Sequence, residues 1–316
     1  MTRIDAPSID DIRAARTRLG QTVLRTPLVR LHVDAPAEIY LKLENLQPIA
    51  SFKLRGAINA MRSLPRETLA EGVYTASAGN MAQGVAWGAR ELGVACTVVM
   101  PETAPKTKVD AVTRLGAKIV LLPYDEWWQT LATHGREGIH GTFIHPVADH
   151  AVMAGNGTVG LEIVEDLPDV SAVLVPFGGG GRVSGIATAV RALAPSAAIY
   201  GCEVATSTPL AAALAARAPV TVERTPSFVD GIGGRGLLPE MWPIVRELVT
   251  GALVAPLADV AAAVRLLVER ARIVAEGAGA TPVACALAGK GGHGKVVCVV
   301  SGGNIDTRTL IDLMSA

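Results

Sequence analysis

Excess charge of either sign is missing from this sequence. Its 29 Lys and Arg residues balance its 29 Asp and Glu residues, and no basic segment stands out. Proteins that bind nucleic acid or anionic membranes usually carry a basic patch, so we expect neither partner. Long apolar runs are missing too: none reaches the roughly 18 residues of a membrane span, and residues 1–7 lack the apolar core of a signal sequence. These absences predict a cytoplasmic protein.

Cysteine and histidine are scarce and scattered. The four cysteines have no Cys-x-x-Cys spacing, and most lie in apolar runs, which predicts buried thiols in a reducing compartment. None of the six histidines belongs to a His-Glu-x-x-His pattern, so we expect no catalytic zinc. The cysteines are Cys96, Cys202, Cys285 and Cys298.

Hydrophobic residues, in contrast, make up 50% of the 316 residues, while 18% are charged, which excludes a disordered chain. The length favours two domains. Apolar strand-like segments alternate with helical ones, and nearly unbroken apolar strands are typical of parallel sheets. We therefore predict an α/β protein with parallel twisted sheets and helices on both faces. A small domain, 72–148, would be inserted into a large domain formed by 1–71 and 149–316.

Lys53 is the candidate nucleophile. It follows Phe52, and we expect Ser51 to cap a helix that has Lys53 in its first turn. The positive end of the helix dipole and the apolar neighbours both disfavour the protonated amine and so lower its pKa. A neutral amine is what a Schiff base with a carbonyl cofactor requires. Considered alone, the segment fits a solvated helix lysine better, because such lysines are common.

Four consecutive glycines join an apolar strand to the start of a helix: Gly178, Gly179, Gly180 and Gly181. Their N–H groups can converge on a phosphate at the positive end of the helix dipole. A flexible turn is the simpler alternative. A dinucleotide site is another, because Glu203 follows the next strand, but no register gives Gly-x-Gly-x-x-Gly. The run favours a monophosphate.

Two further loops follow predicted strands. Ser77, Ala78, Gly79 and Asn80 precede a helix and could hold a carboxylate, although Ser77 or Asn80 could equally be an ordinary N-cap. Ser301 ends the last predicted strand, at the sheet edge that faces ligands in open α/β folds. A serine before two glycines is also common in turns.

Taken together, these segments resemble the motifs of fold-type-II pyridoxal-phosphate enzymes, whose fold is that of the tryptophan synthase β subunit. The resemblance is specifically to the threonine/serine dehydratase and serine racemase family, and it covers nearly the whole chain. The matching motifs occur in the family's order, at residues 51–56, 77–80, 178–181, 276–279 and 301–304.

The resemblance implies a role for each motif. Lys53 would bind pyridoxal 5'-phosphate covalently, Phe52 would flank its ring, and Asn80 would bond its phenolic oxygen. The four glycines would hold the phosphate. Ser301 would meet the pyridine nitrogen, and a serine there favours elimination over deeper carbanion chemistry.

The same resemblance implies four further features. Glu276 would belong to the cofactor site, and Ser77, Ala78, Gly79 and Asn80 would meet the substrate carboxylate. Relatives often bind a divalent or monovalent cation near the position of Glu203, which makes Glu203 a candidate metal ligand. Relatives also suggest a homodimer.

The function implied is that of an ammonia-lyase, in which a β-hydroxy amino acid such as L-threonine or L-serine is converted to a 2-oxo acid and ammonia. Lys53 would remove the Cα proton. Related racemases have a serine where this chain has Ala78, and a methyl group cannot carry a proton, so we favour a dehydratase over a serine racemase.

Two departures from the family pattern leave the substrate open. Met81 stands where a histidine is usual, and Arg182 where an aliphatic residue is usual. Arg182 could bind the second carboxylate of 3-hydroxyaspartate, or it could be a solvated helix-start residue. The alternatives are therefore a 3-hydroxyaspartate or phenylserine dehydratase, a catalytically silent binding protein, or a dinucleotide-dependent oxidoreductase that uses the glycine run.

Overall fold

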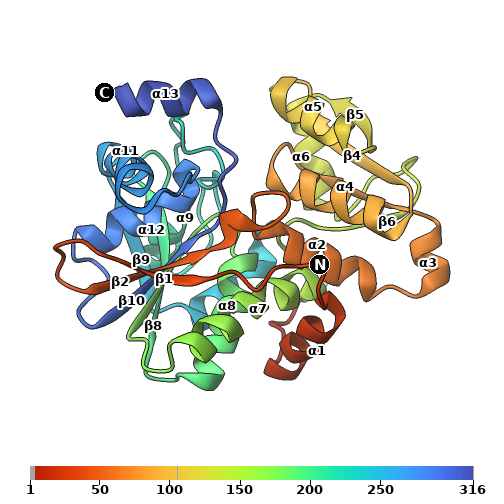
Figure 1. Cartoon of the computed structure of the whole chain (residues 1–316). Coiled ribbons are helices and arrows are strands. Elements are labelled where there is room, and N and C mark those ends of the chain that lie inside the picture. The colour runs from red at the N-terminus through yellow and green to blue at the C-terminus, as the bar shows by residue number, and fades with distance from the viewer. Residues whose placement is uncertain (1–3, 105, 316) are drawn as a thin grey trace.

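The computed structural model describes residues 4–104 and 106–315, so the outer limits of the predicted large domain, residues 1 and 316, lie outside the described part. It contains two separate sheets (Figure 1). The larger has the strand order β1-β2-β10-β7-β8-β9, and all its pairs are parallel except β1 with β2. Its strands are β1 (Leu28–Leu31), β2 (Glu38–Leu43), β7 (Ala172–Pro176), β8 (Ala198–Val204), β9 (Gly251–Ala255) and β10 (Lys295–Val300).

The smaller sheet has the order β5-β4-β3-β6 and is entirely parallel. The α/β fold with parallel sheets, predicted from the apolar strands, is confirmed. Its strands are β3 (Val73–Ala76), β4 (Cys96–Pro101), β5 (Lys118–Leu122) and β6 (Thr142–Phe143).

Helices surround both sheets. The first half of the chain provides α1 (Ile9–Leu19), α2 (Lys53–Arg62), α3 (Arg66–Ala70), α4 (Asn80–Leu92), α5 (Lys106–Arg114), α6 (Tyr124–Ala132) and α7 (His150–Asp166). The second half provides α8 (Gly181–Leu193), α9 (Pro209–Ala216), α10 (Trp242–Leu248), α11 (Leu257–Leu266), α12 (Gly277–Leu287) and α13 (Thr307–Ser315). No helix in the described ranges is long and apolar enough to cross a membrane.

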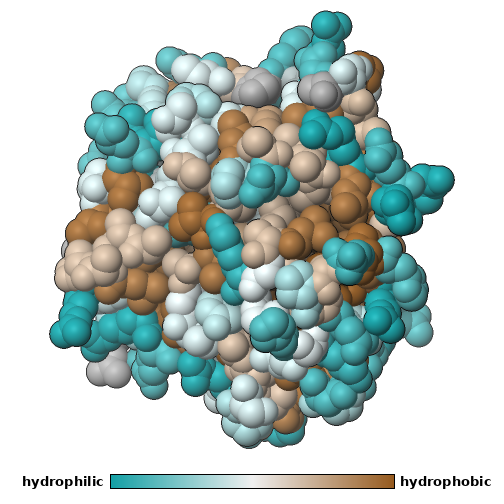
Figure 2. Space-filling model, turned by 90° about the vertical axis from the view of Figure 1, so that its left-hand side faces the viewer, coloured by the Kyte–Doolittle hydropathy of each residue, from teal (hydrophilic) through white to brown (hydrophobic). Residues whose placement is uncertain are grey.

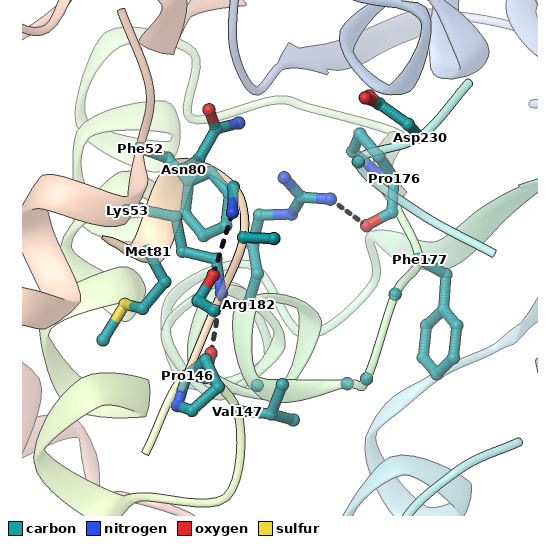
Figure 3. A pocket seen from close by; sticks show the side chains of 18 of the residues that line it. Phe52, Lys53, Asn80, Met81, Pro146, Val147, Pro176, Phe177, Arg182 and Asp230 are labelled. Carbon is teal, nitrogen blue, oxygen red and sulfur yellow. Dashed lines mark hydrogen bonds between the residues drawn. The ribbon is translucent and has the colours of Figure 1, made fainter. Parts of the chain in front are cut away.

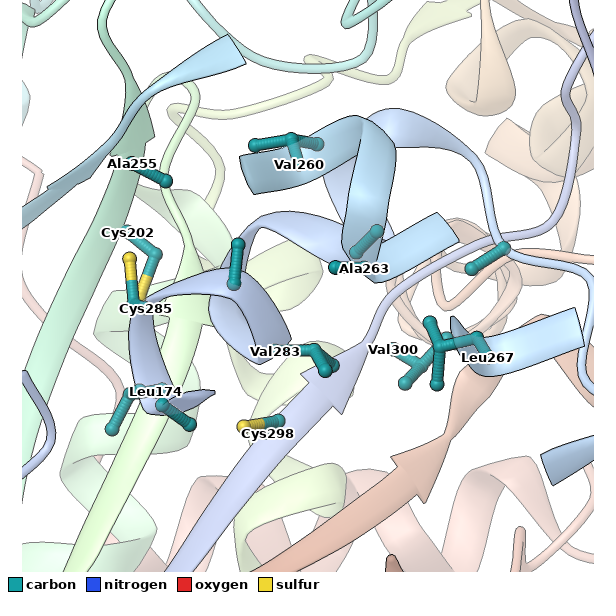
Figure 4. Close-up of a cluster of buried hydrophobic side chains, with 14 of the residues drawn as sticks. Leu174, Cys202, Ala255, Val260, Ala263, Leu267, Val283, Cys285, Cys298 and Val300 are labelled. Atoms are coloured by element: carbon teal, nitrogen blue, oxygen red, sulfur yellow. The ribbon is translucent and has the colours of Figure 1, made fainter. Parts of the chain in front are cut away.

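Alternate residues of the large sheet pack against helices on opposite faces. Val297 and Val299 of β10 lie in a core with α7, α8 and α10, whereas Val296 and Cys298 lie in a core with α11 and α12 (Figure 4). Because both faces are covered, β10 needs apolar residues at successive positions. The four cysteines are buried and free, as expected for thiols inside such cores.

Helix α2 belongs to the core beneath the small sheet. Its Leu54, Ile58 and Met61 share a hydrophobic cluster with Val98 of β4 and Val85 of α4. Side chains on both sides of the predicted domain boundary at residue 72 therefore pack together, and Lys53 begins a helix that lies between the two sheets (Figure 1).

A buried cluster of four charged side chains ties α2 to the large sheet. Arg55 of α2 donates to both oxygens of Glu44 at 2.8 Å and to the two oxygens of Glu162 at 2.6 and 2.9 Å. Lys42 of β2 donates to Glu162 at 2.6 Å. All four side chains are at most 6% exposed, and they form two cations and two anions. This pairing satisfies charges that burial alone would make unfavourable.

Some sequence-based expectations are wrong in detail. Ser51 is not the N-cap of α2: Phe52 is, without a side-chain cap, while Ser51 forms an isolated bridge with Gly302. The apolar periodicity of residues 257–275 predicts one helix, but the α-helix ends at Leu266 and continues as a π-helical turn over Leu267–Ala271. Residues 237–256 have no pattern that predicts an element, yet they contain α10 and β9.

Candidate functional site

A cavity of about 320 Å³ lies where loops associated with both sheets meet (Figure 3). Most of the predicted site residues line it, which places motifs from distant parts of the chain around one space. They are Phe52, Lys53, Ser77, Ala78, Gly79, Asn80, Gly178, Gly179, Gly180, Gly181 and Glu276. Ser301 lies directly behind this wall, since its carbonyl oxygen accepts the Phe52 N–H at 3.0 Å.

Lys53 is the first residue of α2, and its amine points into the cavity. Its Nζ donates to the carbonyl oxygen of Pro146 at 2.6 Å and lies 5.4 Å from the centre of the Phe52 ring. Burial, aided by the positive charge of Arg182, lowers the pKa of Lys53 to about 7. A substantial fraction of the amine is thus neutral near pH 7 and can act as a nucleophile or base, in line with the lowered pKa that the sequence predicts, with desolvation as the main cause.

His145 fixes the conformation of the main chain that faces Lys53, at residues 146–148. Burial, with a smaller contribution from the charge of His134, lowers the pKa of His145 to about 3, so the ring is neutral. Its Nδ1 accepts the N–H groups of Val147 at 3.0 Å and Ala148 at 2.7 Å. This tight turn presents the Pro146 carbonyl oxygen to Lys53 and the Val147 side chain to the glycine loop.

The four-glycine loop needs its glycines. Gly180 has a φ of +101°, a conformation that side chains rarely adopt. A Cβ on Gly179 would lie 2.7 Å from the Val147 side chain, and one on Gly181 would lie 2.5 Å from the Val147 carbonyl oxygen. The loop leads directly into the 13-residue helix α8. These close approaches argue against a merely flexible turn and leave the backbone exposed to an anion at a helix N-terminus.

Asn80 is not an ordinary N-cap, because Gly79 occupies that position without a side-chain bond. The Asn80 amide instead donates to the two oxygens of Glu276 at 3.0 and 3.1 Å. Asn304 in turn donates to Asn80 Oδ1 at 2.8 Å. Burial raises the pKa of Glu276 to about 7, against the opposing effect of the Asn80 hydrogen bond. The chain of polar contacts joins the start of α4 to the large sheet.

Glu203 does not line this cavity. Its two carboxylate oxygens accept the N–H groups of Leu210 at 2.6 Å and Ala211 at 2.9 Å, and so cap the start of α9. Within the described ranges, no three His, Cys, Asp or Glu side chains come together as a possible metal group. The cation near Glu203 stays a prediction, and the position of Glu203 outside this cavity gives no support to the ribose-binding role that favoured a dinucleotide site.

Several residues that line the cavity were not predicted from the sequence. Lys108 of α5 and Asp230 form an ion pair across the cavity, and Val147 packs on the glycine loop. Asp230 lies in the glycine-rich segment 225–236, whose composition indicates a loop, and that composition is the only sequence signal for it. Lys108 and Val147 carry no local pattern that distinguishes them from surface and core residues.

The sequence of residues 19–302 matches the family described as "Pyridoxal-phosphate dependent enzyme". The chain belongs to this family. It is 44% identical over 306 residues to the L-threonine ammonia-lyase of Geobacter sulfurreducens, covering 95% of this chain and 76% of that protein. Among solved structures it is similar to maize serine racemase, with a TM-score of 0.88, 32% identity and 98% coverage of both chains. A threonine deaminase from T.th. has a TM-score of 0.87 and 34% identity over 95% of this chain and 99% of that one.

These similarities confirm the predicted fold-type-II class and its cofactor, pyridoxal 5'-phosphate. The residues present fit that group. Ser301 Oγ is buried and has no hydrogen-bond partner within the described structure, as a group reserved for a ring nitrogen would be. The glycine loop offers backbone N–H groups to a phosphate, and Lys53 supplies the amine.

Proposed function

We propose that this chain is an ammonia-lyase that converts a β-hydroxy amino acid, with L-threonine or L-serine as the substrate, to a 2-oxo acid and ammonia. The observation that carries the proposal is the position of Lys53, whose desolvated amine shares one cavity with the four-glycine loop. The L-threonine ammonia-lyase names of its relatives support the choice of reaction and substrate.

In the proposed reaction the tasks are divided among the residues that line the cavity. Lys53 would hold the cofactor covalently and would take the Cα proton of the substrate at Nζ. The bound cofactor supplies stabilisation of the negative charge that develops at Cα. Ser77, Gly79 and Asn80 bind the substrate carboxylate near the N-terminus of α4.

Ala78 supports a lyase over a racemase. It lines the cavity, and its methyl group can neither give nor take a proton. A racemase needs a proton donor on the face of Cα opposite the lysine. Protonation at Cα from that second face therefore has no side-chain donor at position 78, and elimination of the β-hydroxyl is the favoured outcome.

Lys53→Ala tests the proposal, with Lys106→Ala as the matched control. Lys106 is 85% exposed and pairs with Asp110 on the same helix. We expect purified Lys53→Ala to lose the borohydride-reducible absorbance of the bound cofactor and to release no 2-oxo acid from serine, threonine, 3-hydroxyaspartate or phenylserine. Lys106→Ala should retain both. Sustained keto-acid release by Lys53→Ala would overturn the assignment, and a wild-type protein that binds cofactor but is inactive on all four would favour a silent binding protein.

We also propose that the protein is a cytoplasmic homodimer. Apolar side chains reach the surface in patches between polar ones on the face shown in Figure 2. Leu46, Val274 and Ile311 are large hydrophobic residues at least 43% exposed, and a second copy could cover such residues. Light scattering coupled to gel filtration measures the mass, and a monomeric mass at micromolar concentration would refute the dimer.

A further inference from the structure

Arg182 is a buried cation at the entrance to helix α8. It is the second residue of the helix and follows the four-glycine loop directly. The residue is 9% exposed, and its side chain lines the same cavity as Lys53 (Figure 3). The solvated helix-start arginine considered from the sequence is therefore wrong.

The guanidinium of Arg182 lacks an anionic partner. One nitrogen, Nη2, donates to the carbonyl oxygen of Pro176, while Nε has no hydrogen-bond partner. Its charge lies 4.2 Å above the centre of the Phe52 ring. No carboxylate among residues 4–104 and 106–315 forms an ion pair with it. Burial lowers the pKa of Arg182 to about 9, and the charge of Glu276 offsets only part of that cost.

A comparison with Arg55 shows that Arg182 lacks the carboxylate partners of a buried arginine. Arg55 is similarly buried, yet it meets two carboxylates, those of Glu44 and Glu162. Buried charges in proteins are paired or they are costly, because desolvation is not repaid. The Glu276 carboxylate faces the same cavity but already accepts two hydrogen bonds from Asn80. The partner of Arg182 is therefore an anion that enters the cavity.

Three features that line the same cavity favour a phosphate. The glycine loop exposes backbone N–H groups, α8 adds the positive end of its dipole, and Arg182 adds a full charge one residue further on. A guanidinium binds phosphate oxygens in a bidentate manner. The loop proposed to meet the substrate carboxylate, residues 77–80, comes instead from the start of α4.

We propose that Arg182 binds the phosphate group of the cofactor and is the charged partner of the four-glycine loop. The proposal rests on the proposed placement of the cofactor between Lys53 and that loop. It assigns a function to the residue at which this chain departs from the aliphatic residue of the family.

The test compares two ligands that differ only in the phosphate. Apoprotein is titrated with pyridoxal phosphate and with pyridoxal, and the absorbance of the covalent link to Lys53 reports binding. We expect Arg182→Met to weaken pyridoxal phosphate binding by about 10- to 100-fold, as for loss of a hydrogen bond to a charged group. Pyridoxal binding should not change. Arg182→Lys should recover part of the affinity, because lysine keeps the positive charge but cannot form the two parallel hydrogen bonds of a guanidinium.

Arg191→Met is the matched control. Arg191 lies on the same helix, is exposed, and donates to the Leu248 carbonyl oxygen at 2.8 Å, away from the cavity. Its variant should bind both ligands as wild type does. Circular dichroism establishes that each variant is folded. If Arg182→Met does not fold, the comparison of Arg182→Lys with wild type tests the proposal by itself. Wild-type apoprotein should also bind inorganic phosphate in competition with pyridoxal phosphate, and more tightly than Arg182→Lys does.

Three results would overturn the proposal. One is equal loss of pyridoxal and pyridoxal phosphate binding, which would assign Arg182 to the ring or to folding. Another is unchanged pyridoxal phosphate binding by both Arg182 variants. The third is unchanged cofactor binding with a raised KM for 3-hydroxyaspartate alone, which would assign Arg182 to a second substrate carboxylate. If wild type itself forms no covalent link, the placement of the cofactor at Lys53 fails instead.

Discussion

Arg55 offers the sharpest test of how the site is held in place. It is two residues from Lys53 on α2 and is 2% exposed. Its five hydrogen bonds to charged or hydroxyl side chains, four of them to Glu44 and Glu162, tie this helix to η1 (Glu44–Leu46) and to α7. Arg55→Met removes one of two buried cations and leaves the two carboxylates facing Lys42 alone.

The expected loss in the free energy of unfolding follows from the carboxylate charge that Arg55→Met leaves unpaired. Breaking a buried ion pair by removing one partner costs about 3–5 kcal/mol. Glu44 would keep only its contacts with the Thr26 hydroxyl at 2.6 Å and the Gln47 amide at 3.3 Å. We therefore expect Arg55→Met to lower the free energy of unfolding by about 3–5 kcal/mol. The double variant Arg55→Met/Glu44→Gln restores neutrality and should recover about 2 kcal/mol of that loss.

Urea titration of the cofactor-saturated protein measures these free energies. Fluorescence and circular dichroism should be recorded together, because coincident transitions are needed for a two-state treatment. Arg16→Met is the control: Arg16 pairs with Glu165 at the surface, where the side chains are 48% and 38% exposed. Loss of such a pair costs about 1 kcal/mol or less. If Arg55→Met were no more destabilised than Arg16→Met, or if the double variant were less stable than Arg55→Met, the reasoning would be refuted.

Two further predictions concern the amine and the helix packing. Capture of the cofactor by apoprotein should have a half-maximal rate near pH 7: the amine of Lys53, with its lowered pKa, is protonated below that pH and neutral above it, so capture slows as the pH falls. Stopped-flow absorbance measures the rate, and a midpoint above about pH 9 would match an unperturbed lysine instead. Gly185→Ala should cost about 3 kcal/mol in urea titration, because its Cβ would overlap the Met153 carbonyl oxygen. Gly251→Ala, whose Cβ would meet only the Tyr200 ring at 3.7 Å, should change stability by less than about 0.5 kcal/mol.

The sequence pattern was sufficient to predict those features that depend mainly on residues close together in the chain. The continuous apolar strands predicted the parallel sheets, and the four glycines between a strand and a helix predicted a tight loop, which lines the cavity. Phosphate binding by that loop stays a prediction. The neutral amine of Lys53 was predicted too, but the structure assigns it mainly to burial rather than to the helix dipole. Whether a side chain is desolvated depends on which segments cover it, and neighbouring residues alone do not determine that.

The features that could not be predicted from the sequence depend on contacts between residues far apart in the chain. The bond between Asn80 and Glu276 joins residues 196 positions apart, so the local pattern could not decide between an N-cap and another role for Asn80. Arg182 was placed in solvent for a similar reason, because helix-start arginines are usually exposed. The π-helical turn at Leu267–Ala271 interrupts a periodic apolar pattern that predicted one long helix.

The pairing of β2 with β10 has a consequence for the order in which the protein matures on the ribosome. All four strands of the small sheet emerge within one short stretch, so that sheet can form during synthesis. The large sheet cannot close until Lys295–Val300 has left the exit tunnel and inserted between β2 and β7. Ser301 and the contact that anchors Phe52 follow directly behind. The chain should thus bind pyridoxal phosphate only after β10 has been translated, and nascent chains stalled before β10 should not retain it.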